Sequence, residues 1–152
     1  MKLFVILFLL TPLIAADPAG FAMWSGKQLK GYEKTLAPKI DATKIAIEPL
    51  GKFGNHTFQI AHREGSGLGE LHETQADLFI VQSGEATLVV GGTIPGSKTT
   101  APNEVRGPAV QGGEKKKLGP GDVVHIPPNT AHQLLVDNGK QFTYAIMKVD
   151  SK

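Results

Sequence analysis

The chain has 152 residues, a formal net charge of +2 and no cysteine. This length suffices for one domain with a genuine core, since chains of about 150 residues bury roughly 68–70% of the surface that they expose when unfolded. The 18 glycines and 10 prolines favour many short strands joined by turns over a helical bundle. No basic run is longer than the three lysines at 115–117, which argues against a nucleic-acid partner.

Residues 1–16 have the pattern of a secretory signal peptide. Lys2 precedes a leucine-rich apolar run, and Ala15 and Ala16 offer small residues for cleavage. The run is shorter than the about 20 residues of a spanning helix; an uncleaved membrane anchor is the alternative interpretation. We therefore expect an exported protein, periplasmic or secreted, with no stable membrane anchor after cleavage. Without cysteine, the chain has no disulfide to form and no thiol to carry a lipid.

Residues 17–50 are predicted to be an approach segment to the main domain at residues 51–152. Ser25 is placed to cap a short helix, because apolar residues follow it at spacings of three and four. Pro38 ends this helix. We interpret Trp24, the only tryptophan, as a hydrophobic plug rather than a ligand platform.

Residues 53–63 alternate as a strand does. The alternation places His62 on a face with Phe58 and Ile60, and Arg63 on the opposite face. Two interpretations of His62 stay open. It is either a hydrogen-bonded core histidine or a group that supports a metal ligand.

Two later stretches carry the candidate chemistry, at residues 67–92 and 119–136. In the first, Glu70 and His72 are two residues apart, so both point to the same face of a strand. Asp77 then begins an apolar run that is typical of a buried strand. In the second, His132 opens a strand after a turn. These four potential metal ligands converge only if their strands form a curved, closed sheet.

The two stretches resemble the two sequence motifs of the cupin superfamily, and the resemblance covers about residues 55–150. The first family motif is G-x5-H-x-H-x(3,4)-E-x6-G. His72 matches its second histidine and Gly84 its final glycine, with Asp77 in place of the glutamate. Glu70 stands where the family has its first histidine.

The second family motif is G-x5-P-x-G-x2-H-x3-N. It is met here by Gly121, Pro127 and His132. Asn129 replaces the second glycine and Val136 replaces the asparagine.

The resemblance implies an all-β fold: a cupin, or jelly-roll, β-barrel of two antiparallel sheets with a short N-terminal helical segment. It also implies metal ligands inside the barrel, at Glu70, His72, Asp77 and His132. Two imidazoles with carboxylates suit divalent manganese, iron or zinc better than copper. Glu70 is either a fourth ligand or a base beside bound substrate.

A metal-free site is the alternative. Burying Glu70 and Asp77 together without a cation would be costly, because two carboxylates in a poorly solvated cavity repel each other. This argument favours a metal. The long excursion at residues 93–114 offers Arg106 for substrate, although a surface flap is an equal interpretation. His125 is assigned either to the lip of the pocket or to a structural role.

We therefore expect an exported single-domain cupin that binds one divalent metal in the barrel. It would act on a small molecule as an oxygenase, lyase or isomerase. A non-catalytic protein that binds a sugar or organic acid is the first alternative, and an interaction module with a vestigial site is the second. We also expect a homodimer, because residues 17–50 are long enough to reach a neighbour and cover a sheet edge.

Overall fold

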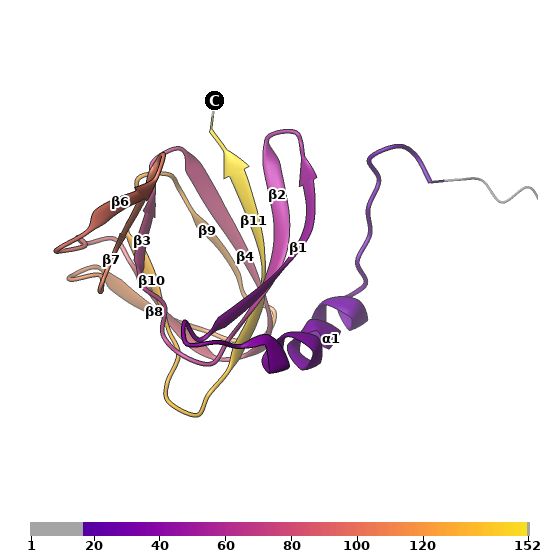
Figure 1. Cartoon of the computed structure of the whole chain (residues 1–152), viewed down its shortest axis with the longest axis horizontal. Helices are drawn as coiled ribbons and strands as arrows, with labels where there is room; N and C mark the ends of the chain where they lie inside the picture. Colours follow the sequence, from indigo (N-terminus) through magenta and orange to yellow (C-terminus); the bar gives the residue numbers. More distant parts are fainter. Residues whose placement is uncertain (1–16, 152) are drawn as a thin grey trace, which may run out of the picture.

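The computed structural model describes residues 17–151, so the predicted signal peptide lies outside the described residues. Two antiparallel sheets face each other and enclose a barrel (Figure 1). The five-stranded sheet has the order β1-β2-β11-β4-β9. The six-stranded sheet has the order β6-β7-β3-β10-β5-β8. The predicted all-β jelly roll of two antiparallel sheets is confirmed.

The bounds of the elements follow. The five-stranded sheet contains β1 (Ile45–Phe53), β2 (His56–Arg63), β4 (Gln75–Gly84), β9 (Val123–Ile126) and β11 (Phe142–Asp150). The six-stranded sheet contains β3 (Gly69–His72), β5 (Ala86–Val90), β6 (Lys98–Ala101), β7 (Glu104–Gly107), β8 (Glu114–Leu118) and β10 (His132–Leu135). Helix α1 (Gly26–Leu36) and the short 3-10 helix η1 (Ala37–Lys39) precede them.

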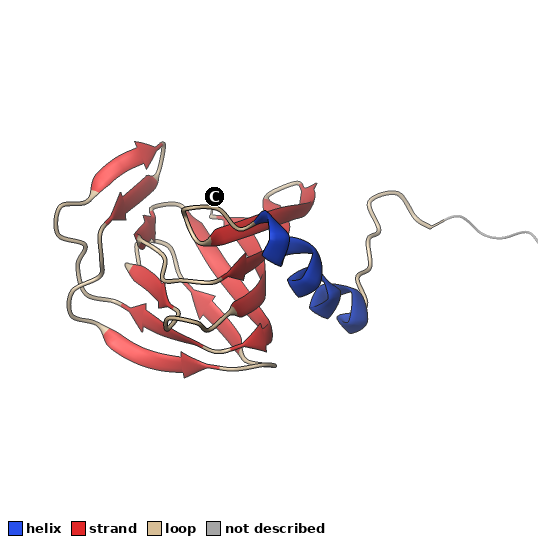
Figure 2. Cartoon of the chain, turned by 60° about the horizontal axis from the view of Figure 1, so that its bottom comes forward, coloured by secondary structure: helices blue, strands red, loops and turns tan. Residues whose placement is uncertain are grey.

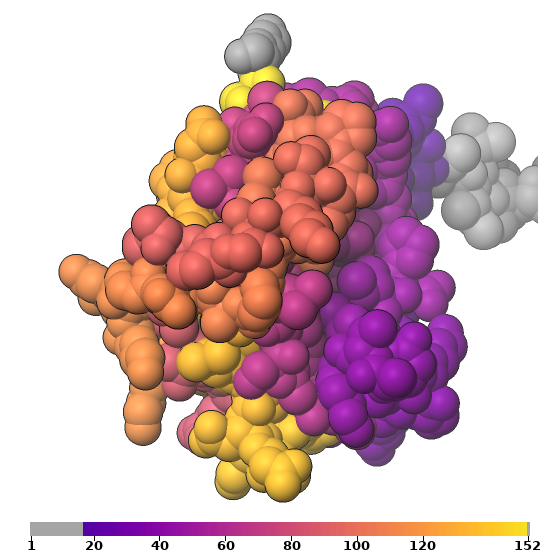
Figure 3. Space-filling view, turned by 60° about the vertical axis from the view of Figure 1, so that its left-hand side comes forward, coloured from indigo at the N-terminus to yellow at the C-terminus, as the bar shows by residue number. Residues whose placement is uncertain are grey.

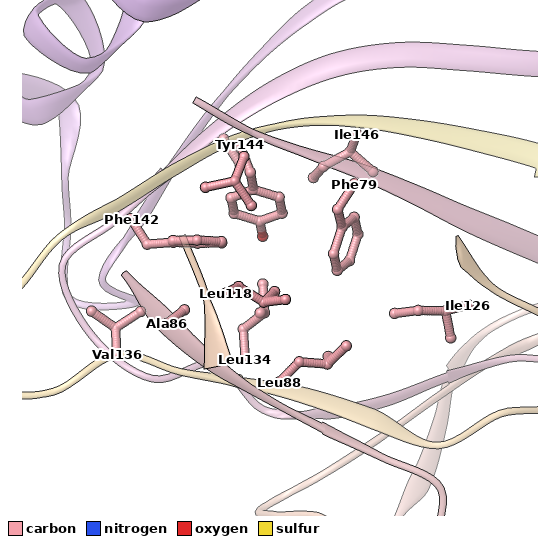
Figure 4. Close-up of a cluster of buried hydrophobic side chains, with 12 residues drawn as sticks. Phe79, Ala86, Leu88, Leu118, Ile126, Leu134, Val136, Phe142, Tyr144 and Ile146 are labelled. Carbon is pink, nitrogen blue, oxygen red and sulfur yellow. The ribbon is translucent and has the colours of Figure 1, made fainter. Parts of the chain in front are cut away.

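The core lies between the two sheets and is built by alternate residues of each strand. In β11, Phe142, Tyr144 and Ile146 point inward and are buried. Figure 4 shows their side chains beside Phe79 of the neighbouring β4 and facing Leu88 of β5 across the interior. Because side chains on a strand alternate between its two faces, this register also decides which polar residues enter the barrel.

Helix α1 packs on the outer face of the five-stranded sheet (Figure 2). Its predicted N-cap is confirmed: Ser25 Oγ accepts from the backbone N–H of Gln28 at 3.2 Å, and the Gln28 side chain accepts from Ser25 N–H at 2.8 Å. Leu36 is fully buried against Ala46 and Ile60. Just before the helix, Trp24 packs edge-on against the same sheet, in agreement with its interpretation as a plug.

The barrel begins earlier in the chain than the sequence suggested. Strand β1 begins at Ile45, so the predicted domain boundary after residue 50 falls inside a strand. This strand accommodates Pro49 because it lies at the sheet edge and is bulged there.

The excursion at residues 93–114 is part of the six-stranded sheet rather than a flap, because β6 and β7 extend that sheet beyond β3. Its orange residues lie across one face of the molecule (Figure 3). A single antiparallel bridge joins Thr93 and Gln111 within the excursion. No helix within residues 17–151 is long and apolar enough to cross a membrane.

Glu33 connects the helix to the barrel and generates a first prediction. Its carboxylate accepts from Ser83 Oγ at 2.5 Å and from Gln141 Nε2 at 2.7 Å. These two hydrogen bonds hold the pKa of Glu33 below its ordinary value. We expect Glu33→Ala to lower the free energy of unfolding by about 1 kcal/mol at pH 7, because charge-assisted hydrogen bonds are lost.

The effect depends on pH. A carboxyl whose pKa is lowered by folding stabilises the folded state above its unfolded pKa, and this contribution is lost as the pH falls through the folded pKa. The loss in Glu33→Ala should therefore shrink in urea denaturation at pH 3. Glu73→Ala, at an exposed glutamate in the turn after β3, serves as the control. Equal losses in Glu33→Ala at both pH values would contradict the prediction.

Candidate metal centre

The four predicted ligands meet inside the barrel, toward the end where the C-terminus lies (Figure 1). Glu70 and His72 come from β3, His132 from the neighbouring β10, and Asp77 from β4 of the opposite sheet. Glu70 and His132 are register partners, which places them side by side. The closed barrel thus brings together residues that are up to 62 positions apart in the sequence.

The distances within this group are short. His72 Nε2 lies 3.3 Å from Asp77 Oδ2 and 3.7 Å from Glu70 Oε2. His132 Nε2 lies 3.6 Å from Asp77 Oδ2. Ligand atoms of Glu70, His72 and His132 all lie within 4.8 Å of one another, which is compatible with one shared ion. Both histidines and Asp77 are buried, and Glu70 is partly buried.

The imidazole of His132 is oriented as that of a metal-bound histidine is, with its outer ring nitrogen hydrogen-bonded to a backbone acceptor. His132 Nδ1 lies 3.0 Å from the carbonyl oxygen of Thr130 and is therefore the nitrogen that donates. His72 Nδ1 lies 2.7 Å from Glu104 Oε1, at an angle too bent for a hydrogen bond. Within the described part of the chain, this buried nitrogen has no aligned partner.

The donor chemistry fits a divalent metal. Nε2 of each imidazole lies on the side of the Asp77 carboxylate, 3.3 Å from Oδ2 for His72 and 3.6 Å for His132. Two imidazoles and one carboxylate are also a ligand set that first-row divalent metals accept.

Three basic side chains surround these ligands. Lys148 of β11 is the register partner of Asp77, and its Nζ lies 2.9 Å from both Asp77 Oδ1 and His72 Nε2. Arg106 of β7 donates from Nη1 to Glu70 Oε1 at 2.7 Å. Arg63 of β2 lies 4.0 Å from the same carboxylate.

The basic residues change the electrostatic argument for a metal. Among the described residues at this site, the three carboxylates of Glu70, Asp77 and Glu104 face the three cations of Arg63, Arg106 and Lys148. We call these six residues, with His72 and His132, the polar cluster. The argument that the carboxylates need a metal to offset their charge is therefore wrong, because the chain supplies the cations itself. The case for a metal rests on ligand geometry instead.

The cluster shifts two pKa values. Burial raises the pKa of Asp77, but His132, His72 and the charge of Lys148 lower it by more, so the pKa lies well below its usual range. Burial and Lys148 lower the pKa of His72, but the carboxylates of Asp77 and Glu104 raise it by more, to above its ordinary value. Asp77 is thus held as an anion.

Two residues expected near the site lie elsewhere. His62 is on the outer face of β2, beneath helix α1, where its Nδ1 lies 2.8 Å from Thr143 Oγ1. The alternation was correct, but that face is the helix-covered one. His125 is exposed, because its neighbour Ile126 takes the inward position in β9. Neither residue belongs to the polar cluster, whereas Arg106 does.

Sequence reasoning missed Lys148 and left Arg63 without a role. Lys148 continues the inward series of Tyr144 and Ile146 in β11, so strand alternation alone could have placed it inside the barrel. Arg63 lies two residues after the buried Ala61 and therefore on the same inward face, and its Nε donates to the hydroxyl of Tyr144 at 3.1 Å. A charged residue in an inward position of an apolar strand is the signal in both cases.

The space beside the cluster is small. A cavity of about 20 Å³ is lined by Arg63, Glu70, Phe79, His132 and Tyr144, among others. This volume is enough for about one water molecule. Among the basic side chains of the polar cluster, Arg106 is the most exposed, at 36%.

No family model and no curated protein matches the sequence. Solved structures with the same fold are found. The protein TT1209 from Thermus thermophilus has a TM-score of 0.56 at 16% identity, covering 78% of this chain and 94% of that one. The DMSP lyase DddQ from Ruegeria pomeroyi has a TM-score of 0.50 at 15% identity, covering 70% and 47%. The polyketide cyclase RemF from Streptomyces resistomycificus has a TM-score of 0.50 at 15% identity, covering 70% and 65%.

These similarities define a class of fold. The neighbours are cupin-like, and the chain therefore has the cupin fold, as its motifs predicted. At identities of 15–16% the similarity extends to the fold and not to the activity.

The placement of His62 generates a second prediction. Thr143→Val removes the hydroxyl partner of a fully buried imidazole nitrogen, so we expect the free energy of unfolding to fall by about 1–3 kcal/mol. Metal affinity should not change, because His62 lies outside the barrel. Chemical denaturation and metal titration measure the two quantities, with the exposed Thr99→Val as control. A large drop in metal affinity would place His62 in the site after all.

Proposed function

We propose that the chain is an exported, single-domain cupin that binds one divalent metal and acts on a small molecule. The observation that carries this proposal is the convergence of Glu70, His72 and His132 within 4.8 Å inside the barrel. Nothing in the packing of a barrel requires two imidazoles and a carboxylate at one point. Export rests on residues 1–16, and a homodimer stays a prediction.

Glu70, His72 and His132 would hold the metal, and Asp77 is placed to join them. Nitrogen and carboxylate ligands suit manganese, iron or zinc. When bound, such a cation supplies Lewis acidity that polarises an oxygen of the small molecule. The alternative role of Glu70, which lies 2.7 Å from Arg106, is that of a base that accepts a proton from that molecule while Asp77 takes its place as ligand.

The charge of the polar cluster favours an anionic small molecule. Three carboxylates and three basic side chains balance within the described site, so a bound divalent cation adds positive charge that a carboxylate of the ligand would offset. Arg106 is the most exposed of the named cations and is placed to receive it. Two neighbours of the fold are named as a lyase and a cyclase, which supports a chemical role.

The ligand assignment is tested by removing an imidazole. Loss of a contact that only supports a ligand weakens metal binding by roughly 10–100-fold. We expect His132→Ala and His72→Ala each to weaken it by more, because each removes a direct ligand. Isothermal titration with Zn²⁺ or Mn²⁺ gives the affinity, and the gain in melting temperature on metal addition gives an independent measure.

His125→Ala is the matched control, since this imidazole is exposed on the outer face of β9. It should bind metal as the unaltered protein does. If His132→Ala and His72→Ala also match the unaltered protein, the two histidines are pocket walls. A non-catalytic binding protein for a sugar or organic acid would then replace the metalloprotein.

Export gives a separate prediction. Mature protein recovered from its own host should begin near Asp17 and should lie outside the cytoplasm, because residues 1–16 carry the signal-peptide pattern. N-terminal sequencing of the cell fractions measures this. Cytoplasmic protein with an intact Met1 would show that the leader is not a signal peptide.

A further inference from the structure

The position that faces His72 and Asp77 already holds a cation, which is the ammonium group of Lys148. Its Nζ lies 2.9 Å from His72 Nε2 and 2.9 Å from Asp77 Oδ1. We propose that Lys148 is a built-in competitor for the divalent metal, and that it must leave His72 before this side chain can serve as a ligand. This inference rests on the proposed metal site and adds a residue that limits its affinity.

The competition follows from the number of lone pairs. An ammonium group only donates hydrogen bonds, so its short contact with His72 Nε2 requires that this nitrogen accept. A neutral imidazole nitrogen has one lone pair. The same Nε2 is the ring atom that faces Glu70 and Asp77, and hence the one available to a shared ion. It cannot serve the ammonium group and a metal together.

Asp77 is engaged through one of its two carboxylate oxygens. Its Oδ1 accepts from Lys148, and its Oδ2 lies toward His72 and His132. Asp77 is missing from the group whose ligand atoms already lie within 4.8 Å of one another. Lys148 thus contacts two of the four predicted ligands, and His72 is the one whose single available lone pair it occupies.

Lys148 can leave without unfolding the barrel. Its side chain is 19% exposed, near the end of the last strand, and its four-carbon stem is flexible. In its present position it neutralises the buried Asp77, which would otherwise be an unpaired buried charge. The metal-free protein is thereby stabilised, and the same contact is lost when the metal binds.

The test is Lys148→Met, which keeps the length of the side chain and removes its charge and donors. We expect this variant to bind Zn²⁺ and Mn²⁺ at least about tenfold more tightly than the unaltered protein, because no charge-assisted hydrogen bond has to be broken. Its metal-free form should melt at a lower temperature, since Asp77 loses its partner. Added metal should raise that temperature by more than in the unaltered protein.

Lys115→Met is the matched control, because Lys115 is an exposed lysine of β8. It should match the unaltered protein in affinity and in melting temperature. If metal-free Lys148→Met fails to fold, Lys148→Gln keeps a donor without the charge and should shift the affinity in the same direction.

The outcomes separate this inference from the proposed function. Equal affinities of Lys148→Met and the unaltered protein would overturn the competition and leave the metal site standing. Weaker binding by Lys148→Met would show that Lys148 positions the ligands, and would also overturn the competition. If neither protein binds Zn²⁺ or Mn²⁺, the metal site and the competition fail together.

Discussion

The packing of two sheets over one apolar core sets the position of every side chain in the candidate site. Each strand contributes alternate residues to the interior, so the register that buries Tyr144 and Ile146 also carries Lys148 inward. Toward one end of the barrel the inward residues become polar. Buried polar groups are costly unless they are paired, and the eight residues of the polar cluster meet this requirement largely through one another.

The balance of charge within the cluster has two consequences. The carboxylates of Glu70 and Asp77 are stable without a metal, because Arg106 and Lys148 donate to them. The same contacts reduce the affinity for a metal, since the metal must replace an ammonium group at His72 Nε2. Metal-free stability and metal affinity are therefore opposed in this site through a single side chain.

The excursion between the two motifs shows how an added pair of strands alters such a site. Strand β7 pairs with β3 and places Glu104 beside His72 and Arg106 beside Glu70. A barrel closed without β7 would leave the Glu70 carboxylate without the guanidinium that it contacts at 2.7 Å. The segment that looked like a flap in the sequence therefore supplies two members of the polar cluster.

The sequence by itself predicted the capped helix after Ser25 from local spacing and capping residues. It predicted the fold class and the convergence of Glu70, His72, Asp77 and His132 through its resemblance to the two cupin motifs. Only the tertiary structure decided which face of each strand is the interior. Alternation sorts the residues of a strand into two sets without saying which set faces the barrel interior, so it left two roles open for His62. Helix α1, which covers the outer face of the five-stranded sheet, accounts for the burial of His62 outside the barrel. The pairing of Asp77 with Lys148 joins residues 71 positions apart through β4 and β11, and no local pattern carries that information.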